Sequence, residues 1–183
     1  MYENWDELEK ECKNCKKCKL CSTRKNIVIG TGNKKAEIMF IGEGPGADED
    51  EQGIPFVGKA GQLMNKALQG IGLNREDIYI TNIVKCRPPQ NRNPEKDEAD
   101  ICKEYIDSQI KLINPKVIVL LRKCSTKKYI RGRIWNNIKQ RKMVWKRWNK
   151  NTTNISSSST SKRWKQENIF LERFKTTKII KIE

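Results

Sequence analysis

The stretch that decides the fold is Glu37–Gly46, which reads EIMFIGEGPG. Its first six residues, Glu37–Gly42, form a short, continuous apolar run that ends in glycine. This pattern predicts a buried strand followed by a tight loop. Two further runs, Asp77–Val84 and Val117–Leu121, are rich in β-branched residues and predict two more strands. Continuous apolar strands are typical of a parallel sheet that is covered on both faces.

Helical patterns separate these three strands. Gly61–Leu73 carries apolar residues at helical spacing, with glycines near its end. A second helix is predicted to begin at Pro94, because Asn93 before it is a good capping residue, and to end before Pro115. The alternation of strands and helices predicts an α/β fold, a three-layer sandwich around a central, mostly parallel sheet. Ligands bind such sheets beyond the carboxyl ends of the strands, which is where Gly42–Gly46 is expected to lie.

The charged residues are distributed unevenly along the chain. Residues 1–121 contain 19 Lys and Arg and 19 Asp and Glu, whereas residues 122–183 contain 19 basic and 3 acidic residues. The formal net charge of +16 therefore belongs to the second part, which has no regular periodicity and includes the run Ser156–Ser159. We predict that residues 122–183 are a basic tail, irregular or disordered rather than a folded domain. Val117–Leu121 would then keep an unpaired edge.

Two features bear on the cellular compartment. No stretch of about 18 apolar residues is present, so no membrane span is expected, and the polar segment Met1–Asp6 is unlike a signal peptide. Four of the seven cysteines are bunched near the N-terminus, at Cys12, Cys15, Cys18 and Cys21. Without a secretion signal, this bunching favours metal binding over disulfides, so we expect a reducing cytoplasm.

Four sequence blocks follow one another in the first part: Cys15–Cys21, Gly42–Asp50, Gly53–Gly61 and Thr81–Pro89. Together and in this order they resemble the family 4 uracil-DNA glycosylases of the iron–sulfur uracil-DNA glycosylase superfamily. The resemblance covers about residues 1–121. It implies a hydrolase of base excision repair that cleaves the N-glycosidic bond of uracil in DNA. Uracil-containing DNA is thus the expected partner, and we expect a monomer with no membrane partner.

The resemblance also implies a [4Fe-4S] cluster. Such a cluster needs four thiolates, and the residues that match the ligands of the family are Cys15, Cys18, Cys86 and Cys102. The spacing alone also permits a zinc site with the same four ligands. Cys12 and Cys21 are interpreted as non-ligands. The cluster is expected to act structurally, because it would join the N-terminal segment to the regions around Cys86 and Cys102.

By the same resemblance, the uracil pocket contains Gly42, Glu43 and Gly44, together with Asn82 and Phe56. The Asn82 amide offers the acceptor and the donors that the edge of uracil requires. The Phe56 ring can stack on a base that has been flipped out of the duplex. Without the resemblance, a strand-end asparagine is more often a turn residue, and a lone phenylalanine is more often a core residue.

Charged residues near these blocks are candidates for catalysis and DNA binding. Glycoside hydrolysis needs a positioned water and negative charge near an oxocarbenium-like centre, and carboxylates supply both. The candidates are Glu49, which we favour, and Glu43. Lys85, Arg87 and Arg92 are predicted to contact backbone phosphates, and solvated surface charge is the alternative.

The resemblance ends near Leu121. The family continues with a loop of the type His-Pro-x-x-Leu, whose histidine donates to a uracil oxygen, but this chain contains no histidine. The abrupt change of composition is typical of a shifted reading frame, which we hypothesise near residues 121–122; a genuine basic tail is the alternative. We therefore expect the activity of this chain to be impaired. The alternative function is a non-catalytic iron–sulfur or zinc protein that binds nucleic acid.

Overall fold

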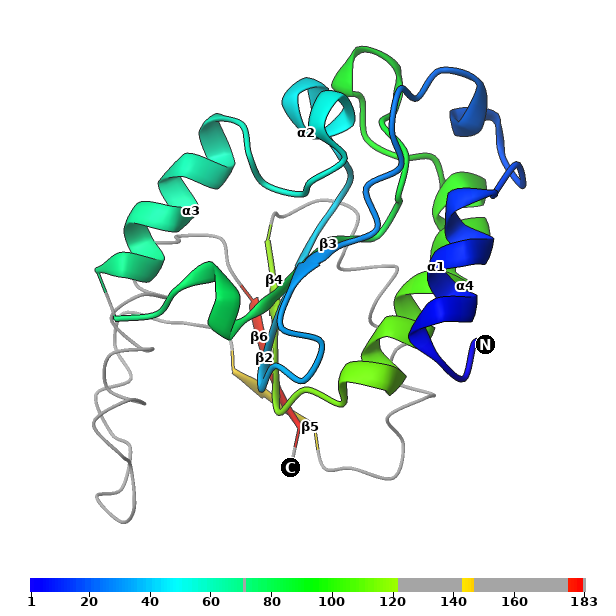
Figure 1. Ribbon diagram of the computed structural model, residues 1–183. Coiled ribbons are helices and arrows are strands. Elements are labelled where there is room, and N and C mark those ends of the chain that lie inside the picture. The colour runs from blue at the N-terminus through cyan, green and yellow to red at the C-terminus, as the bar shows by residue number, and fades with distance from the viewer. Residues whose placement is uncertain (71, 122–142, 147–177, 183) are drawn as a thin grey trace, which may run out of the picture.

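The computed structural model describes residues 1–70, 72–121, 143–146 and 178–182 (Figure 1). Within this part of the chain, the strands form one six-stranded sheet in the order β1-β3-β2-β4-β6-β5. The strands are β1 (Thr31–Gly32), β2 (Ile38–Gly42), β3 (Tyr79–Asn82), β4 (Val117–Leu120), β5 (Met143–Lys146) and β6 (Lys178–Ile182).

The centre of the sheet is parallel and its edges are antiparallel. β2 pairs in parallel with β3 on one side and with β4 on the other. At one edge β1 is antiparallel to β3, and at the other β6 is antiparallel to β4 and β5 to β6. The predicted α/β fold with a mostly parallel centre is therefore confirmed.

Helices cover both faces of the sheet. The α-helices are α1 (Trp5–Lys13), α2 (Ala47–Gln52), α3 (Lys59–Gln69) and α4 (Lys96–Ile113). Short 3-10 helices occur at Lys19–Ser22, Arg75–Asp77 and Pro89–Asn91. α1 and α4 lie on one side of the sheet and α3 on the other (Figure 1), which confirms the three-layer sandwich. No helix in the described segments has the length and apolar character needed to cross a membrane.

Alternate residues of β2 belong to two different cores. Met39 and Ile41 pack with the residues of α1 and α4, whereas Ile38 and Phe40 pack with those of α3. This alternation follows from the two-residue period of a strand. Every residue of β2 is buried, because both faces of the sheet are covered. The continuous apolar run in the sequence has this physical origin.

Two of the differences from the sequence prediction concern elements near the strand ends. α4 begins at Lys96, after Glu95 rather than after Asn93, because the Glu95 N–H donates to the Glu98 carboxylate at 2.8 Å and caps the first turn. The segment after β2 contains the short helix α2, which the glycine-rich pattern did not predict. Its cap at Gly46 places a turn of helix directly after the loop.

The second part of the chain contributes β5 and β6 to the sheet. Ile118 of β4 pairs with Ile180 of β6, and Val119 pairs with Ile179. The prediction that β4 keeps an unpaired edge is therefore wrong. The remaining residues of 122–183 lie outside the described part of the chain, so the irregular tail and the division at residue 121 stay predictions.

Candidate active site and cysteine centre

The carboxyl ends of β2 and β3 bring three of the predicted pocket residues together. Gly42 ends β2 and is the parallel partner of Asn82, which ends β3. A Cβ atom on Gly42 would lie 2.3 Å from Asn82 Oδ1 and 2.6 Å from Phe56 Cζ. Both distances are too short for a real side chain. The absence of a side chain at Gly42 therefore allows the Asn82 amide and the Phe56 ring to approach each other.

The backbone of Phe56 is held in an unusual conformation. Its φ of 55° lies in the left-handed region, which residues other than glycine rarely adopt. Arg75 Nη1 donates to the Phe56 carbonyl at 2.8 Å, and Nη2 donates to the Pro55 carbonyl at 2.5 Å. On the α3 side, a Cβ on Gly61 would lie 1.8 Å from the Phe56 oxygen. A backbone fixed in this way by its surroundings is typical of functional sites.

The side-chain amide of Asn82 has no protein partner among the residues that the structure describes. The residue is 2% exposed, and its main-chain carbonyl accepts a hydrogen bond from Lys85 Nζ at 2.7 Å. Its side-chain amide makes no hydrogen bond to any residue in the described part of the chain. An amide that lacks a protein partner can hydrogen-bond a ligand through both its oxygen and its NH₂ group. The site therefore favours a ligand that supplies both a donor and an acceptor.

Glu43 and Gly44 lie in the loop just beyond Gly42. The Gly42 carbonyl accepts from Ile83 N at 3.0 Å and the Glu43 carbonyl from Val84 N at 3.2 Å, so the pairing of β2 with β3 continues past the strand ends. A Cβ on Gly44 would lie 2.9 Å from Val84 Cγ2. This close packing holds the loop beside Asn82 and keeps Glu43 buried.

Glu49 joins two loops of the site. It lies in the first turn of α2, where Oε2 accepts from Gly46 N at 3.0 Å. Oε1 accepts from Val57 N and from Gly58 N, both at 2.9 Å. The carboxylate thus fastens the segment that carries Phe56 to the start of α2. This positioning role was not predicted; its predicted role on a water molecule stays a prediction.

The four predicted cysteine ligands come from three segments. Cys15 and Cys18 lie between α1 and the 3-10 helix at Lys19–Ser22, Cys86 follows β3, and Cys102 lies on α4. Burial raises the pKa of Cys86, and the charges of Cys18 and Cys15 add to this effect. Burial likewise raises the pKa of Cys102 to about 12, with contributions from Cys86 and Cys18. The fold therefore brings these thiols near enough to interact electrostatically.

Cys12 is a fifth thiol in the same region. It is fully buried on α1, and burial raises its pKa to about 12, with further contributions from Cys102, Cys15 and Cys86. Sequence interpretation placed Cys12 outside the motif and did not find this neighbourhood. Its four-residue spacing from Leu8 on an amphipathic helix was the signal that could have located it.

The cysteines supply the kind of donors that the implied cluster needs. The described residues contain no group of three or more Cys, His, Asp or Glu side chains arranged so that it could hold a metal ion as it stands. The set fits a thiolate-bound cluster in the number and chemistry of its donors. It also has cations nearby: Arg24 Nη1 donates to Cys86 Sγ at 3.1 Å, and Lys85 lies beside Cys102 and Cys86. Such cations offset the buried negative charge of thiolates.

Lys85 is buried rather than available to DNA. Its side chain is 0% exposed, and Nζ donates at 2.7 Å to Thr81 Oγ1, to the Asn82 carbonyl and to Gln109 Oε1. Burial lowers its pKa to about 8, while the charges of Cys12 and other nearby thiols act in the opposite direction. The prediction that Lys85 contacts phosphates is therefore wrong. A lysine near the end of a strand gives no signal in the sequence that its side chain faces inward.

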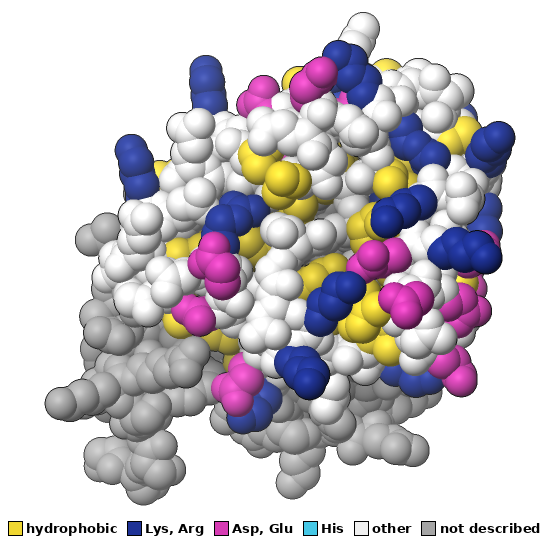
Figure 2. All heavy atoms as spheres, in the orientation of Figure 1, with side chains coloured by type: hydrophobic (Ala, Val, Ile, Leu, Met, Phe, Trp, Pro, Cys, Tyr) yellow, Lys and Arg dark blue, Asp and Glu magenta, His cyan; other side chains and the backbone are white. Residues whose placement is uncertain are grey.

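The other two predicted phosphate contacts have protein partners. Arg87 Nε donates to Asn91 Oδ1 at 2.8 Å, and Arg92 forms two bonds to Glu98, at 2.8 Å and 2.6 Å. Figure 2 shows basic and acidic side chains interspersed on the described face, in line with the balanced charge of residues 1–121. The two predicted contacts with phosphate stay predictions.

Fold and site together define a class of protein: an α/β fold in which an amide and an aromatic ring meet at the carboxyl ends of the parallel strands, where sheets of this kind bind their ligands. The family model of the uracil DNA glycosylase superfamily matches residues 29–177, and the chain belongs to this superfamily. The matched range extends beyond residue 121, where the recognisable motifs end.

The most informative relatives are type-4 uracil-DNA glycosylases. The chain is 52% identical to the enzyme of Archaeoglobus fulgidus over 119 residues, which are 65% of this chain and 60% of the relative. It is 54% identical to the enzyme of Saccharolobus solfataricus over 125 residues, 68% of this chain and 58% of the relative. A type-5 uracil-DNA glycosylase of Thermus thermophilus is 31% identical over 106 residues. The chain thus spans about three fifths of the length of the type-4 relatives.

Proposed function

We propose that this protein hydrolyses the N-glycosidic bond between uracil and deoxyribose in DNA. The observation that carries the proposal is the convergence of Gly42, Asn82 and Phe56 at the ends of β2 and β3. An amide without a protein partner, beside an aromatic ring, suits a flat base with an imide edge. The identity of about one half to the type-4 enzymes supports the same substrate.

Uracil must leave the duplex before it can enter this pocket, because its glycosidic bond is inaccessible in a stacked helix. In the proposal, the Phe56 ring stacks on the flipped base, a contact worth about 1–3 kcal/mol. The Asn82 amide pairs with the imide edge of uracil. Gly42, Glu43 and Gly44 line the base, and Gly42 is small enough to leave room for it.

Glu49 is the favoured carboxylate for positioning the attacking water, and Glu43 is the second candidate. A carboxylate accepts about four hydrogen bonds. Glu49 already accepts three from main-chain N–H groups, which leaves room for one water. The same three bonds fix its direction, so the water would be held in one place.

The absence of histidine bears on the rate. The resemblance implies a histidine that donates to uracil as negative charge develops on the leaving base, and this sequence has none. Loss of one such donor costs about 10²–10³-fold in rate. The proposal is therefore slow excision by this chain, with uracil recognition retained in the pocket.

The proposed cofactor is a [4Fe-4S] cluster held by Cys15, Cys18, Cys86 and Cys102. When bound, it would cross-link the N-terminal segment, the loop after β3 and α4. Iron analysis of the purified chain tests this, with about four irons per chain expected. Cys86→Ala should abolish iron binding, whereas the control Cys21→Ala should not. One zinc per chain, or full iron retention in Cys86→Ala, would contradict the proposed cluster.

Uracil release from a single-stranded oligonucleotide tests the activity. We expect slow release by the unaltered chain, none from the same oligonucleotide with thymine in place of uracil, and less release by Asn82→Ala. Asn14→Ala, an exposed asparagine at the end of α1, is the matched control and should behave as the unaltered chain. Equal binding of both oligonucleotides without any release would favour the non-catalytic nucleic-acid-binding alternative.

We further infer that the protein acts as a monomer in a reducing cytoplasm, with uracil-containing DNA as its partner. Thiols without disulfide partners among the described cysteines support the reducing compartment. Sedimentation of the purified chain at several concentrations tests the monomer. A mass that rises with concentration would contradict it.

A further inference from the structure

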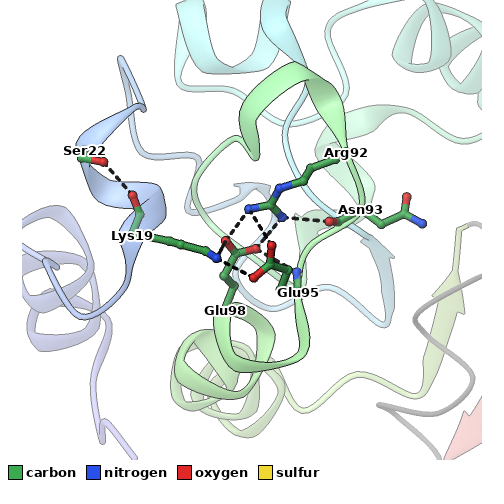
Figure 3. A network of polar contacts seen from close by, with 6 residues as sticks. All are labelled: Lys19, Ser22, Arg92, Asn93, Glu95 and Glu98. Carbon is green, nitrogen blue, oxygen red and sulfur yellow. Dashed lines mark hydrogen bonds and ion pairs between the residues drawn. The ribbon is translucent and has the colours of Figure 1, made fainter.

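Glu98 is a buried carboxylate at the start of α4. Its side chain is 0% exposed, and it accepts hydrogen bonds from Arg92 Nη2 at 2.6 Å and from Arg92 Nη1 at 2.8 Å. The Glu95 N–H also donates to it, at 2.8 Å. The two-pronged contact with Arg92 holds the pKa of Glu98 below its usual range. Figure 3 shows these groups converging on one point in front of α4.

A third segment reaches the same point. Lys19 extends from the 3-10 helix at Lys19–Ser22 (Figure 3), and its Nζ lies 2.5 Å from Glu95 Oε2 and 4.0 Å from Glu98 Oε1. The Lys19–Glu95 pair is exposed, so by itself it contributes little. Its significance lies in which segment it attaches to Glu98.

Each charged member of this network comes from a segment that carries a proposed cluster ligand. Lys19 directly follows Cys18. Arg92 lies in the loop that begins after Cys86. Glu98 lies on α4 one turn before Cys102. The network therefore joins the same three segments as the proposed cluster, but it does so with protein groups alone.

We propose that Glu98 is a positioning residue for the cysteine set, which holds the three ligand-bearing segments in place and so retains the cluster. The inference rests on the proposed ligand set. A buried charge is strongly unfavourable once it loses its partner, so Arg92 and Glu98 constrain each other more firmly than surface pairs do. Residues that orient metal ligands typically alter metal affinity by about 10–100-fold when they are replaced.

The chain offers a matched control on the same helix. Glu104 of α4 pairs with Lys17 at 3.1 Å and with the N-terminal amine at 3.3 Å, so it also attaches the N-terminal segment to α4. Its side chain is 39% exposed, in contrast to that of Glu98. Glu98→Gln and Glu104→Gln therefore remove the same charge from the same helix, one from a buried network and one from an exposed pair.

The test measures the rate at which a chelator removes iron from the full chain. The loss of visible absorbance of the cluster reports this rate. Glu98→Gln should accelerate release by about 10–100-fold, and Glu104→Gln should release iron as the unaltered chain does. Arg92→Lys keeps the charge but loses the two-pronged geometry, so it should give an intermediate rate. Arg92→Lys also serves as the deciding variant if Glu98→Gln does not fold.

Three outcomes would overturn the proposal. The first is wild-type release by folded Glu98→Gln, or by folded Arg92→Lys. The second is equal acceleration by Glu98→Gln and Glu104→Gln, because it would assign the effect to surface charge. The third is an unaltered chain that binds no iron, which would overturn the ligand set together with the positioning role. Only this last result also bears on the proposed cofactor, so the two failures are distinguishable.

Discussion

Arg75 Nη1 donates to the main-chain carbonyl of Phe56 at 2.8 Å, and this bond fixes the residue that carries the ring of the proposed uracil pocket. The same nitrogen lies 3.0 Å from Asn65 Oδ1 on α3. Burial lowers the pKa of Arg75, but a guanidinium stays charged in proteins. A partly buried cation thus holds the main chain at Phe56, where φ is 55°.

Arg75→Gln should weaken binding of a uracil-containing oligonucleotide, because the Phe56 ring would no longer be held for stacking. The expected loss is at most the stacking energy itself, about 1–3 kcal/mol. A double-mutant cycle with Phe56→Ala checks it: Arg75→Gln should add no loss once the ring is gone. Additive losses in the double variant would assign Arg75 a role that does not act through Phe56.

Gly42→Ala should reduce uracil excision and destabilise the protein. The new Cβ would lie 2.3 Å from Asn82 Oδ1 and 2.6 Å from Phe56 Cζ, so both side chains would have to move apart. Overpacking of this kind costs about 1–3 kcal/mol. Gly70→Ala is the control, because its φ of −63° suits alanine and the nearest atom to its Cβ is 3.4 Å away. Excision rates and unfolding curves of both variants measure the difference. Unchanged excision by Gly42→Ala would show that the pocket does not lie at this position.

Replacement of the two candidate carboxylates separates positioning from catalysis. Glu49→Gln replaces one acceptor oxygen with an NH₂ group that faces main-chain donors, so the free energy of unfolding should fall by about 1–3 kcal/mol. Excision should fall with it, since the Phe56 loop is released. Both quantities should be measured at one temperature, with Glu51→Gln as an exposed control on α2. Glu49→Gln that keeps full stability but loses excision would point to water positioning alone.

Much of the fold could be predicted from the sequence, because its strands are buried on both faces. The run Glu37–Gly42 and the β-branched residues of β3 and β4 signal such strands directly. The pocket residues were predicted from the family resemblance. Gly42 and Asn82 close adjacent parallel strands, so their proximity follows once the sheet is known. The glycine at position 42 is the feature of the sequence that this close approach requires.

Other features depend on tertiary contacts that leave no local pattern. The inward direction of Lys85 is set by acceptors on β3 and α4, notably Gln109, which is far away in the sequence. The cap of α4 at Glu95 depends on Glu98, whose own position depends on Arg92. The pairing of β6 with β4 joins segments on either side of a long stretch of basic sequence. Periodicity and composition are local properties of the sequence, so they do not predict these long-range contacts.

The pH dependence of stability should report on Asp107, a buried carboxylate on α4. Burial raises its pKa above the ordinary 3.8, although Lys103 at 2.5 Å and the N-terminal amine act in the opposite direction. A raised pKa in the folded state means that the stability contributed by this group is fully present below 3.8 and is lost as the pH rises through the folded value. Asp107→Asn should therefore melt at a higher temperature than the unaltered chain at neutral pH. The two melting temperatures should converge in acid, where Asp107 is neutral in both the folded and the unfolded chain. Melting curves across this range decide the matter: a variant that is less stable at neutral pH would show that the ion pair with Lys103 outweighs the effect of burial.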